Sequence, residues 1–245
     1  MKKNIVVTNG NQEFNQEIST YLLKKGHSVT LFFEDDEAEW NYLKKIEEIE
    51  KPSYKGFFMK EVTEVKLQHA LEDIVSHSGT IDILLHGNEM VNEEELLLKD
   101  VEHFDTYITK QFHQMYLLNK LVSSLMVKKK KGSIIFPILY DALYFAGYPS
   151  SPILNQGKIS MMKCLSRELS AFRLSVNVMT FGYYNSAFDK EEKKNMKKKL
   201  EIYGLKPKLP ELNELISALD ILIDPPSSAI SGQDFHIGVG IETGL

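Results

Sequence analysis

The sequence predicts a single α/β domain, built on a doubly wound parallel sheet with helices on both faces. Short β-rich segments alternate with segments of helical spacing along all 245 residues, and regular alternation of this kind favours a parallel sheet. Hydrophobic residues make up 43% and charged residues 26% of the chain, a balance typical of packed globular domains. No linker rich in Pro, Gly or Ser and no internal repeat interrupts the chain. One domain covering residues 1–245 is therefore the simplest interpretation.

The strands are predicted from short runs of β-branched, aromatic and other apolar residues bounded by polar residues or glycine. The helices are predicted from apolar residues spaced three or four apart, as in Phe14, Ile18 and Leu22, a pattern closed by Gly26. The predicted strands are residues 4–8, 27–33, 56–59, 81–85, 132–138, 175–180 and 234–239. The predicted helices are residues 12–25, 37–50, 65–76, 104–128, 151–172, 190–199 and 212–222.

Composition excludes several classes of function. The net charge of −5 gives no general attraction to nucleic acid. No apolar run approaches the roughly 18 residues of a membrane span, and the first residues lack a signal-peptide core, so a cytoplasmic protein is expected. Cys164 is the only cysteine and is expected in the core, without a disulfide. His86 has no second His, Cys or carboxylate at ligand spacing, so no metal site is predicted.

Residues 132–173 form a predicted strand, a loop rich in Gly, Pro, Tyr and Ser, and a long helix that contains Lys158. This segment resembles the catalytic segment of the short-chain dehydrogenase/reductase family, and residues 227–245 (SSAISGQDFHIGVGIETGL) resemble the family's ending. The likeness extends over nearly the whole chain and is greatest to β-ketoacyl-[acyl carrier protein] reductases. It implies a seven-stranded parallel sheet in the order 3-2-1-4-5-6-7.

The same resemblance identifies four catalytic positions, three of which are altered. The family's Ser falls at about Ile138 or Leu139, and the Tyr of its Tyr-x-x-x-Lys motif falls at Leu154. Lys158 keeps the family's Lys, whereas Gln111 replaces an Asn that holds a relay water. Leu cannot donate or accept a proton, so the family's acid/base chemistry is not expected here.

The glycine-rich turn that receives a pyrophosphate in the family reads T-G-x-x-x-G-x-G. Here it begins at Thr8; its glycines are replaced by Asn9, Glu13 and Asn15, while Gly10 stands at a variable position. Asn tolerates a left-handed backbone, so the two asparagines can preserve the turn. Glu13 is the least compatible change, because like charges about 4 Å apart repel by roughly 4 kcal/mol at an effective dielectric constant near 20. Its alternative role is to favour the helix dipole.

Two further positions that contact the dinucleotide in the family are changed. Phe33 stands where an Asp selects NAD, and the acidic residues after it disfavour a 2′-phosphate: Glu34, Asp35 and Asp36. The family's N-N-A-G after strand four reads His86, Gly87, Asn88 and Glu89. The altered motifs together predict that no dinucleotide cofactor is bound.

The sequence leaves two functions open. One is a non-catalytic binding or scaffold protein descended from a reductase, in which Lys158 pairs with a carboxylate or a carbonyl. The other is an atypical oxidoreductase that uses NAD or NADP. In that case a relocated tyrosine, Tyr140, Tyr144 or Tyr148, would act as the acid with Lys158.

The resemblance also implies partners. Family members pair through the helices that match residues 104–127 and 152–172, so a homodimer or homotetramer is expected from their apolar residues: Tyr116, Leu117, Met161, Met162 and Leu165. Reductases of the family dock an acidic carrier protein through basic residues that match Lys129, Lys130, Lys131 and Arg173. The alternative for the lysine run is a solvated helix C-terminus.

Overall fold

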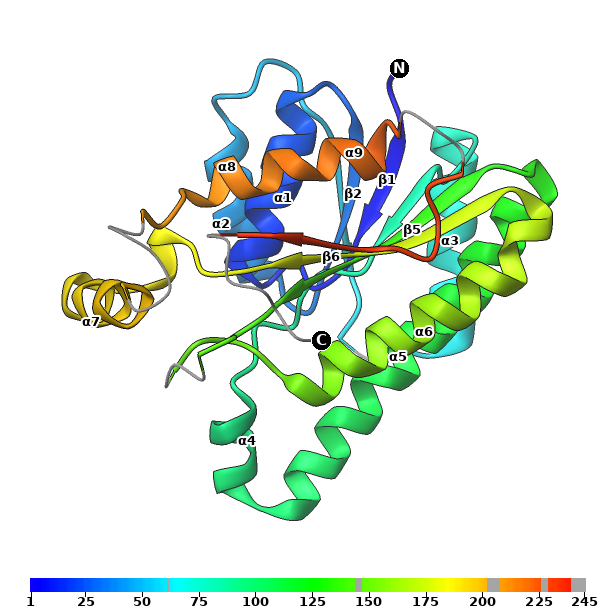
Figure 1. The fold of residues 1–245 in the computed structure, drawn as a ribbon. Coiled ribbons are helices and arrows are strands. Elements are labelled where there is room, and N and C mark those ends of the chain that lie inside the picture. Colours follow the sequence, from blue (N-terminus) through cyan, green and yellow to red (C-terminus); the bar gives the residue numbers. More distant parts are fainter. Residues whose placement is uncertain (61, 144–146, 202–207, 226–228, 239–245) are drawn as a thin grey trace.

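The computed structural model describes residues 1–60, 62–143, 147–201, 208–225 and 229–238. Its centre is a seven-stranded parallel sheet in the order β3-β2-β1-β4-β5-β6-β7, as the sequence predicted (Figure 1). The strands are β1 (Asn4–Val7), β2 (Ser28–Phe33), β3 (Ser53–Phe58), β4 (Ile83–Leu85), β5 (Gly132–Leu139), β6 (Leu174–Phe181) and β7 (Asp234–Ile237). The predicted end of the last strand, residue 239, lies outside the described residues.

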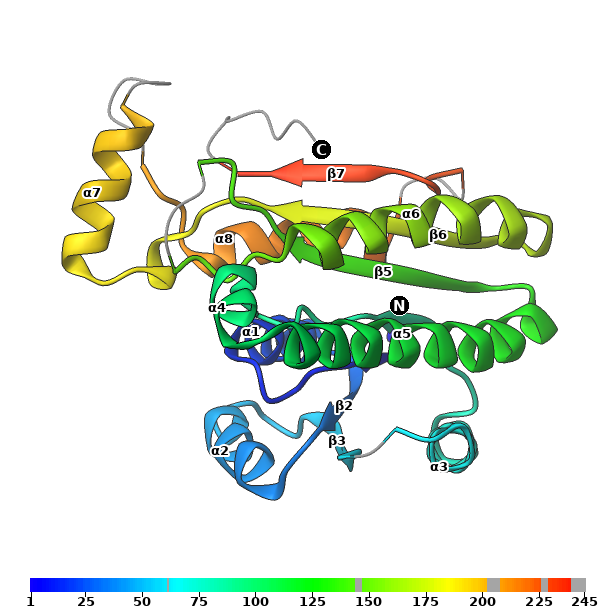
Figure 2. The same ribbon diagram turned by 90° about the horizontal axis from the view of Figure 1, so that it is seen from below.

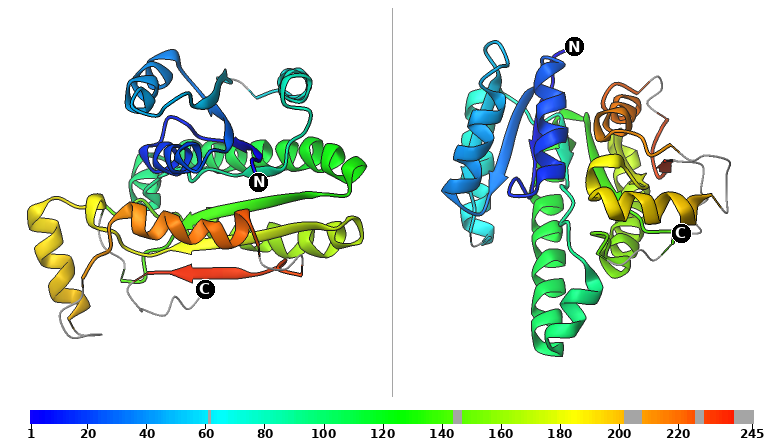
Figure 3. Two further views of the ribbon diagram at one scale, coloured as in Figure 1. Left: turned by 90° about the horizontal axis from the view of Figure 1, so that it is seen from above. Right: turned by 90° about the vertical axis from the view of Figure 1, so that its left-hand side faces the viewer.

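Helices cover both faces of the sheet. The described helices are α1 (Glu13–Lys24), α2 (Asp36–Ile46), α3 (Glu64–Ser78), α4 (Glu93–Lys99), α5 (Val101–Lys129), α6 (Pro152–Leu169), α7 (Lys190–Leu200), α8 (Leu212–Ile216) and α9 (Asp220–Ile223). One hydrophobic cluster joins α1, α2, α8 and α9 to one face, and a second joins α3, α5 and α6 to the other. Figure 2 shows α5 and α6 running side by side, and Figure 3 shows α7 standing away from the sheet.

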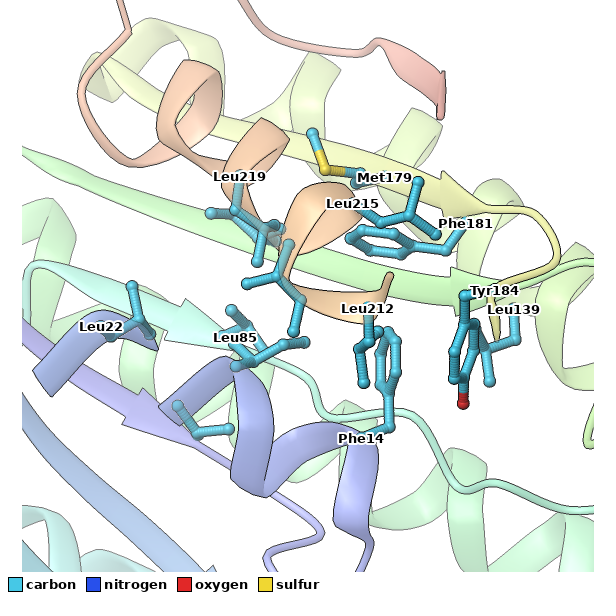
Figure 4. Packing of buried hydrophobic residues seen from close by; sticks show 14 of the residues in the cluster. Phe14, Leu22, Leu85, Leu139, Met179, Phe181, Tyr184, Leu212, Leu215 and Leu219 are labelled. Carbon is cyan, nitrogen blue, oxygen red and sulfur yellow. The ribbon is translucent and has the colours of Figure 1, made fainter. Parts of the chain in front are cut away.

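Alternation along the strands divides the core between the two faces. On β5, Ile134 and Phe136 belong to the cluster with α3, α5 and α6, whereas Ile135 and Leu139 belong to the cluster with α1 and α8. Successive side chains of a strand point to opposite faces, so strands covered on both faces are apolar throughout. Figure 4 shows side chains of α1, α8 and the strands meeting in the cluster that contains α1 and α8.

Two helices differ from the prediction. Helix α4 was not predicted, although Asn92 and the run Glu-Glu-Glu-Leu-Leu-Leu-Lys form a start signal; the Asn92 side chain accepts a hydrogen bond from the amide of Glu94 at 3.0 Å. The predicted helix at residues 212–222 is divided into α8, a 3-10 turn at Ser217–Leu219, and α9. Within the described residues, no helix combines the length and the apolar content that a membrane crossing requires.

Three residues on α5 and α6 differ in burial from what the sequence predicted. Cys164 is exposed rather than in the core, because it lies about 200° around the helix from the fully buried Met162. Leu117 and Met162 were expected at a subunit interface but are buried within the monomer, whereas Tyr116 is 61% exposed. Met161 and Leu165 are partly buried against the core.

Candidate functional site

The altered motifs gather at the carboxyl ends of β1, β4 and β5. Strand β1 lies between β2 and β4 in the sheet, so the chain reverses its direction of travel across the sheet at this point. Ligands of doubly wound folds bind in the crevice at such a switch point. The loops after β1 and β4 and the helices α1 and α6 therefore define the place where a cofactor would be expected.

The turn after β1 is held by its own hydrogen bonds, without the family's glycines. Asn9 has a φ of 56°, the left-handed conformation that asparagine tolerates, and its side-chain amide donates to the carbonyl of Gly87 at 2.8 Å. The amide of Gly10 donates to the carbonyl of Phe32 at 2.7 Å. A Cβ at position 10 would lie only 2.8 Å from that carbonyl oxygen, so glycine is required there by close approach to β2.

Asn15 supports the turn in a different way from the one expected. It is buried inside α1, not in a left-handed conformation. Its side-chain amide donates to the backbone carbonyls of Asn9 and Asn88, each at 2.8 Å. Its side-chain oxygen accepts from the backbone amide of Asn88, also at 2.8 Å. Asn15 thereby joins the turn after β1 to the loop after β4.

Close packing fills the remaining space between these two segments. The Gly87 amide donates to the Thr8 hydroxyl at 2.9 Å. A Cβ at position 87 would lie 2.1 Å from the Thr8 carbonyl oxygen. The turn and the loop are therefore bonded to each other by groups of the chain itself.

Glu13 and Phe33, the other two altered cofactor positions, have different environments. Glu13 is the first residue of α1 and is exposed, so its carboxylate stands at the helix end where a phosphate group would otherwise be favoured. The Phe33 side chain is buried in the core, with its ring centroid 6.1 Å from that of Tyr42. It offers no hydrogen bond to a ribose.

Lys158, the one catalytic residue that is retained, is completely buried on α6, with 0% of its side chain exposed. Its Nζ donates to Oε2 of Glu89 at 2.5 Å, and the Glu89 side chain is 5% exposed. A carboxylate partner was one of the roles that the sequence left open for Lys158, but the sequence did not identify Glu89. The available signal was that Glu89 replaces the last Gly of the family's N-N-A-G motif.

Leu139 and Leu154, which replace the family's Ser and Tyr, are both buried. Leu139 ends β5, and its backbone carbonyl oxygen accepts from the Asn155 side-chain amide at 2.7 Å and from the Ser150 hydroxyl at 3.0 Å. Leu154 packs in the hydrophobic cluster beneath α5 and α6. Gln111 on α5 is also buried. Neither leucine places a proton donor at the site.

Of the tyrosines considered as replacement acids, Tyr148 is buried and already hydrogen-bonded within the chain. The Tyr148 hydroxyl donates to the carbonyl of Gly182 at 3.0 Å, and its ring stacks on Phe188. Burial raises the pKa of Tyr148, which makes its ionisation at neutral pH harder. Tyr140 is half-buried at the end of β5, and Tyr144 lies outside the described residues.

His86 is buried beneath the same site. Its Nε2 lies 2.9 Å from the side-chain oxygen of Asn119, and its ring stacks on Phe136 at a centroid distance of 4.6 Å. Burial lowers the pKa of His86 to about 4, so the ring is neutral. The described residues contain no group of three or more His, Cys, Asp or Glu side chains arranged to hold a metal ion.

The basic residues lie at the opposite, amino-terminal edge of the sheet. Lys129 ends α5, and Lys130 follows it as a left-handed cap. Lys131 and Arg173 directly precede Gly132 and Leu174, which face each other across β5 and β6. Lys131 and Arg173 line one cavity of about 200 Å³, so the fold brings together these residues, which are distant in sequence.

Comparisons with known proteins agree with this architecture. A family model described as short chain dehydrogenase matches residues 3–197. The chain is 22% identical over 237 residues to the 3-oxoacyl-[acyl-carrier-protein] reductase FabG of Salmonella typhimurium, covering 96% of each chain. It is 22% identical to FabG of Staphylococcus epidermidis over 249 residues, covering 98% of this chain and 99% of that one. A solved short-chain type dehydrogenase/reductase from Mycobacterium ulcerans superposes with a TM-score of 0.78 at 15% identity, covering 96% of this chain and 88% of that one.

Proposed function

Because this chain belongs to the short-chain dehydrogenase family, we propose that it is a member that has lost dinucleotide binding and carbonyl reduction. In this proposal it works in the cytoplasm as a non-catalytic binding or scaffold protein. The buried ion pair between Lys158 and Glu89 carries the proposal. By resemblance to the family, Lys158 would hold the nicotinamide ribose and lower the pKa of the acid, but here its ammonium group is neutralised by the chain's own carboxylate.

Releasing Lys158 to a ribose would leave Glu89 as a buried, uncompensated charge. Breaking a buried pair in this way costs about 3–5 kcal/mol, which is a large part of the binding free energy of a micromolar ligand, about 8 kcal/mol. Glu13 adds a negative charge at the end of α1, where phosphate would lie. These costs act on the same ligand, so they support loss of the cofactor.

The atypical oxidoreductase remains the second candidate, with Tyr148 as the replacement acid. Its hydroxyl is engaged with the Gly182 carbonyl, and its raised pKa is the reverse of the tuning that a general acid/base needs near neutral pH. These contacts favour the non-catalytic function over the oxidoreductase.

Titration of the unmodified protein with NADH and NADPH is the direct test. We expect no saturable heat in calorimetry and no change in nicotinamide fluorescence at cofactor concentrations up to about 1 mM. Such concentrations detect any site whose binding free energy exceeds about 4 kcal/mol. A FabG reductase titrated in parallel is the positive control. Micromolar binding by the unmodified protein, or its turnover of any carbonyl substrate, would refute the proposal.

We also propose self-association through the outward faces of α5 and α6. The support is the exposure of Tyr116 on α5 and of Ile153 and Phe172 at the two ends of α6, apolar side chains that a second copy of the chain would cover. We expect light scattering at micromolar concentration to give the mass of a dimer or tetramer. Tyr116→Glu should shift this mass toward that of the monomer, whereas a monomeric unmodified protein would contradict the proposal.

An acidic carrier protein is the partner that we propose for Lys129, Lys130, Lys131 and Arg173. The support is the shared cavity at Lys131 and Arg173, together with relatives named for reduction of an acyl-carrier-protein substrate. We expect the double variant Lys131→Glu/Arg173→Glu to weaken binding of an acyl carrier protein at low salt by about tenfold or more. Lys24→Glu, at an exposed position on α1, is the control; equal losses in both variants would argue against this docking site.

A further inference from the structure

A second cavity lies beside the amino terminus of α1, between this helix, the segment after β6 and the start of α8. Its volume is about 200 Å³, and the described residues that line it include three carboxylates, those of Glu13, Glu17 and Glu211, and no Lys, Arg or His. Side chains of Phe14, Tyr184 and Leu212 add an apolar wall. A cavity of this composition is unsuited to a phosphate group but complementary to a cation.

Two of the three negative charges in this cavity are not neutralised. Glu17 forms an ion pair with Lys45 at 2.5 Å. Glu211 accepts a hydrogen bond from the neutral side chain of Asn185 at 2.5 Å, which leaves its charge in place. Within the described part of the chain, Glu13 has neither a hydrogen bond nor an ion pair from its carboxylate. The site therefore offers two negative charges to a ligand.

Tyr184 gives independent support for a ligand. The residue is only 4% exposed, yet within the described residues its hydroxyl has no hydrogen-bond partner, although it lines the cavity. Burial and the charge of Glu13 raise the pKa of Tyr184 to about 12, so the hydroxyl stays protonated. The oxygen is not among the fully enclosed unpaired atoms of the described residues, so the hydroxyl is reached from the cavity and is available to a bound molecule.

The surroundings specify an organic cation. The described carboxylates do not converge as a metal-holding group. The Phe14 and Tyr184 rings lie 6.2 Å apart between centroids, and aromatic faces attract ammonium groups. We propose that this cavity binds a small aliphatic diamine as its dication, with one ammonium group at Glu13, the other at Glu211, and the methylene chain against Phe14 and Leu212.

This inference rests on the proposed function, because a dinucleotide at the end of α1 would place its phosphates beside the same carboxylates. The test is calorimetric titration of the full chain with 1,4-diaminobutane in about 0.15 M salt, where long-range surface attraction is screened. We expect saturable binding at one site, and binding of butylamine, which has the same chain and one charge, about tenfold weaker.

Two variants locate the ligand. Glu13→Gln and Tyr184→Phe should each weaken diamine binding by about three- to tenfold, because the first removes a charge and the second an unpaired hydroxyl. Glu168→Gln, at an exposed position on α6, removes the same charge outside the cavity and should leave binding unchanged. Circular dichroism confirms that each variant is folded before it is titrated.

Each outcome decides a separate question. If neither the diamine nor a dinucleotide binds, the diamine site is overturned and the proposed loss of cofactor binding stands. If NADH binds and displaces the diamine, the proposed function fails. Diamine binding that Glu13→Gln and Tyr184→Phe leave unchanged overturns the assignment to this cavity. Equal affinity for butylamine and the diamine overturns recognition of two charges.

Discussion

Lys158→Met is expected to lower the free energy of unfolding by about 3–5 kcal/mol. The substitution leaves the Glu89 carboxylate buried without a cation, since Nζ of Lys158 is its ion-pair partner at 2.5 Å. Urea unfolding followed by circular dichroism measures this change as a shift of the midpoint at constant slope. The control is Lys120→Met, which removes the exposed pair with Glu64 and should cost no more than about 1 kcal/mol.

The double variant Lys158→Met/Glu89→Leu is expected to recover most of this loss. Both charges are then absent, and apolar replacements of a buried ion pair are often neutral or stabilising. The difference between the double variant and the sum of the single variants measures the interaction of the two residues. If Lys158→Met costs less than about 1 kcal/mol, the pair is not the buried, dry contact on which the proposed function depends.

Restoring the missing acid alone is not expected to restore carbonyl reduction. In Leu154→Tyr, Lys158 is still bound to Glu89 and Glu13 still stands at the end of α1, so NADH oxidation with a 3-oxoacyl substrate should remain at background. In Glu13→Gly/Glu89→Gly/Leu154→Tyr these two obstacles are removed, and NADH lacks the 2′-phosphate that Glu34, Asp35 and Asp36 disfavour. We expect this triple variant to oxidise NADH at least about 100-fold faster than Glu13→Gly/Glu89→Gly, the lower end of the usual contribution of a general acid.

The structure decides which substitutions belong in that experiment. Asn15 also replaces a motif glycine, but it makes three hydrogen bonds that join two loops, so Asn15→Gly would destabilise the site instead of opening it.

The matched control without a hydroxyl is Leu154→Phe in the Glu13→Gly/Glu89→Gly background. Reduction by Leu154→Tyr alone would show that the Glu89 pair does not limit the chemistry. Equal rates with Phe and Tyr at position 154 would show that the restored hydroxyl is not the acid.

Local patterns in the sequence were sufficient to predict most of the strands and helices, because strand and helix periodicities depend on nearest neighbours along the chain. The order of the seven parallel strands was implied by the family resemblance, and the structure confirms it. The left-handed Asn9 and the buried, apolar Leu139 and Leu154 were also predictable, because backbone tolerance and the inability of Leu to transfer protons belong to the residue type. Helix α4 was predictable in principle from Asn92 and the acidic run that follows.

The tertiary structure decided which groups meet. Glu89 and Lys158 are 69 residues apart, and only the convergence of the loop after β4 with α6 at one edge of the sheet makes them partners. The same holds for Asn15 with Asn88, for Lys131 with Arg173, and for the carboxylates of Glu13 and Glu211 around one cavity. A sequence determines residue types and their local periodicity, whereas the distance between residues of different elements is set by the packing of those elements against the sheet.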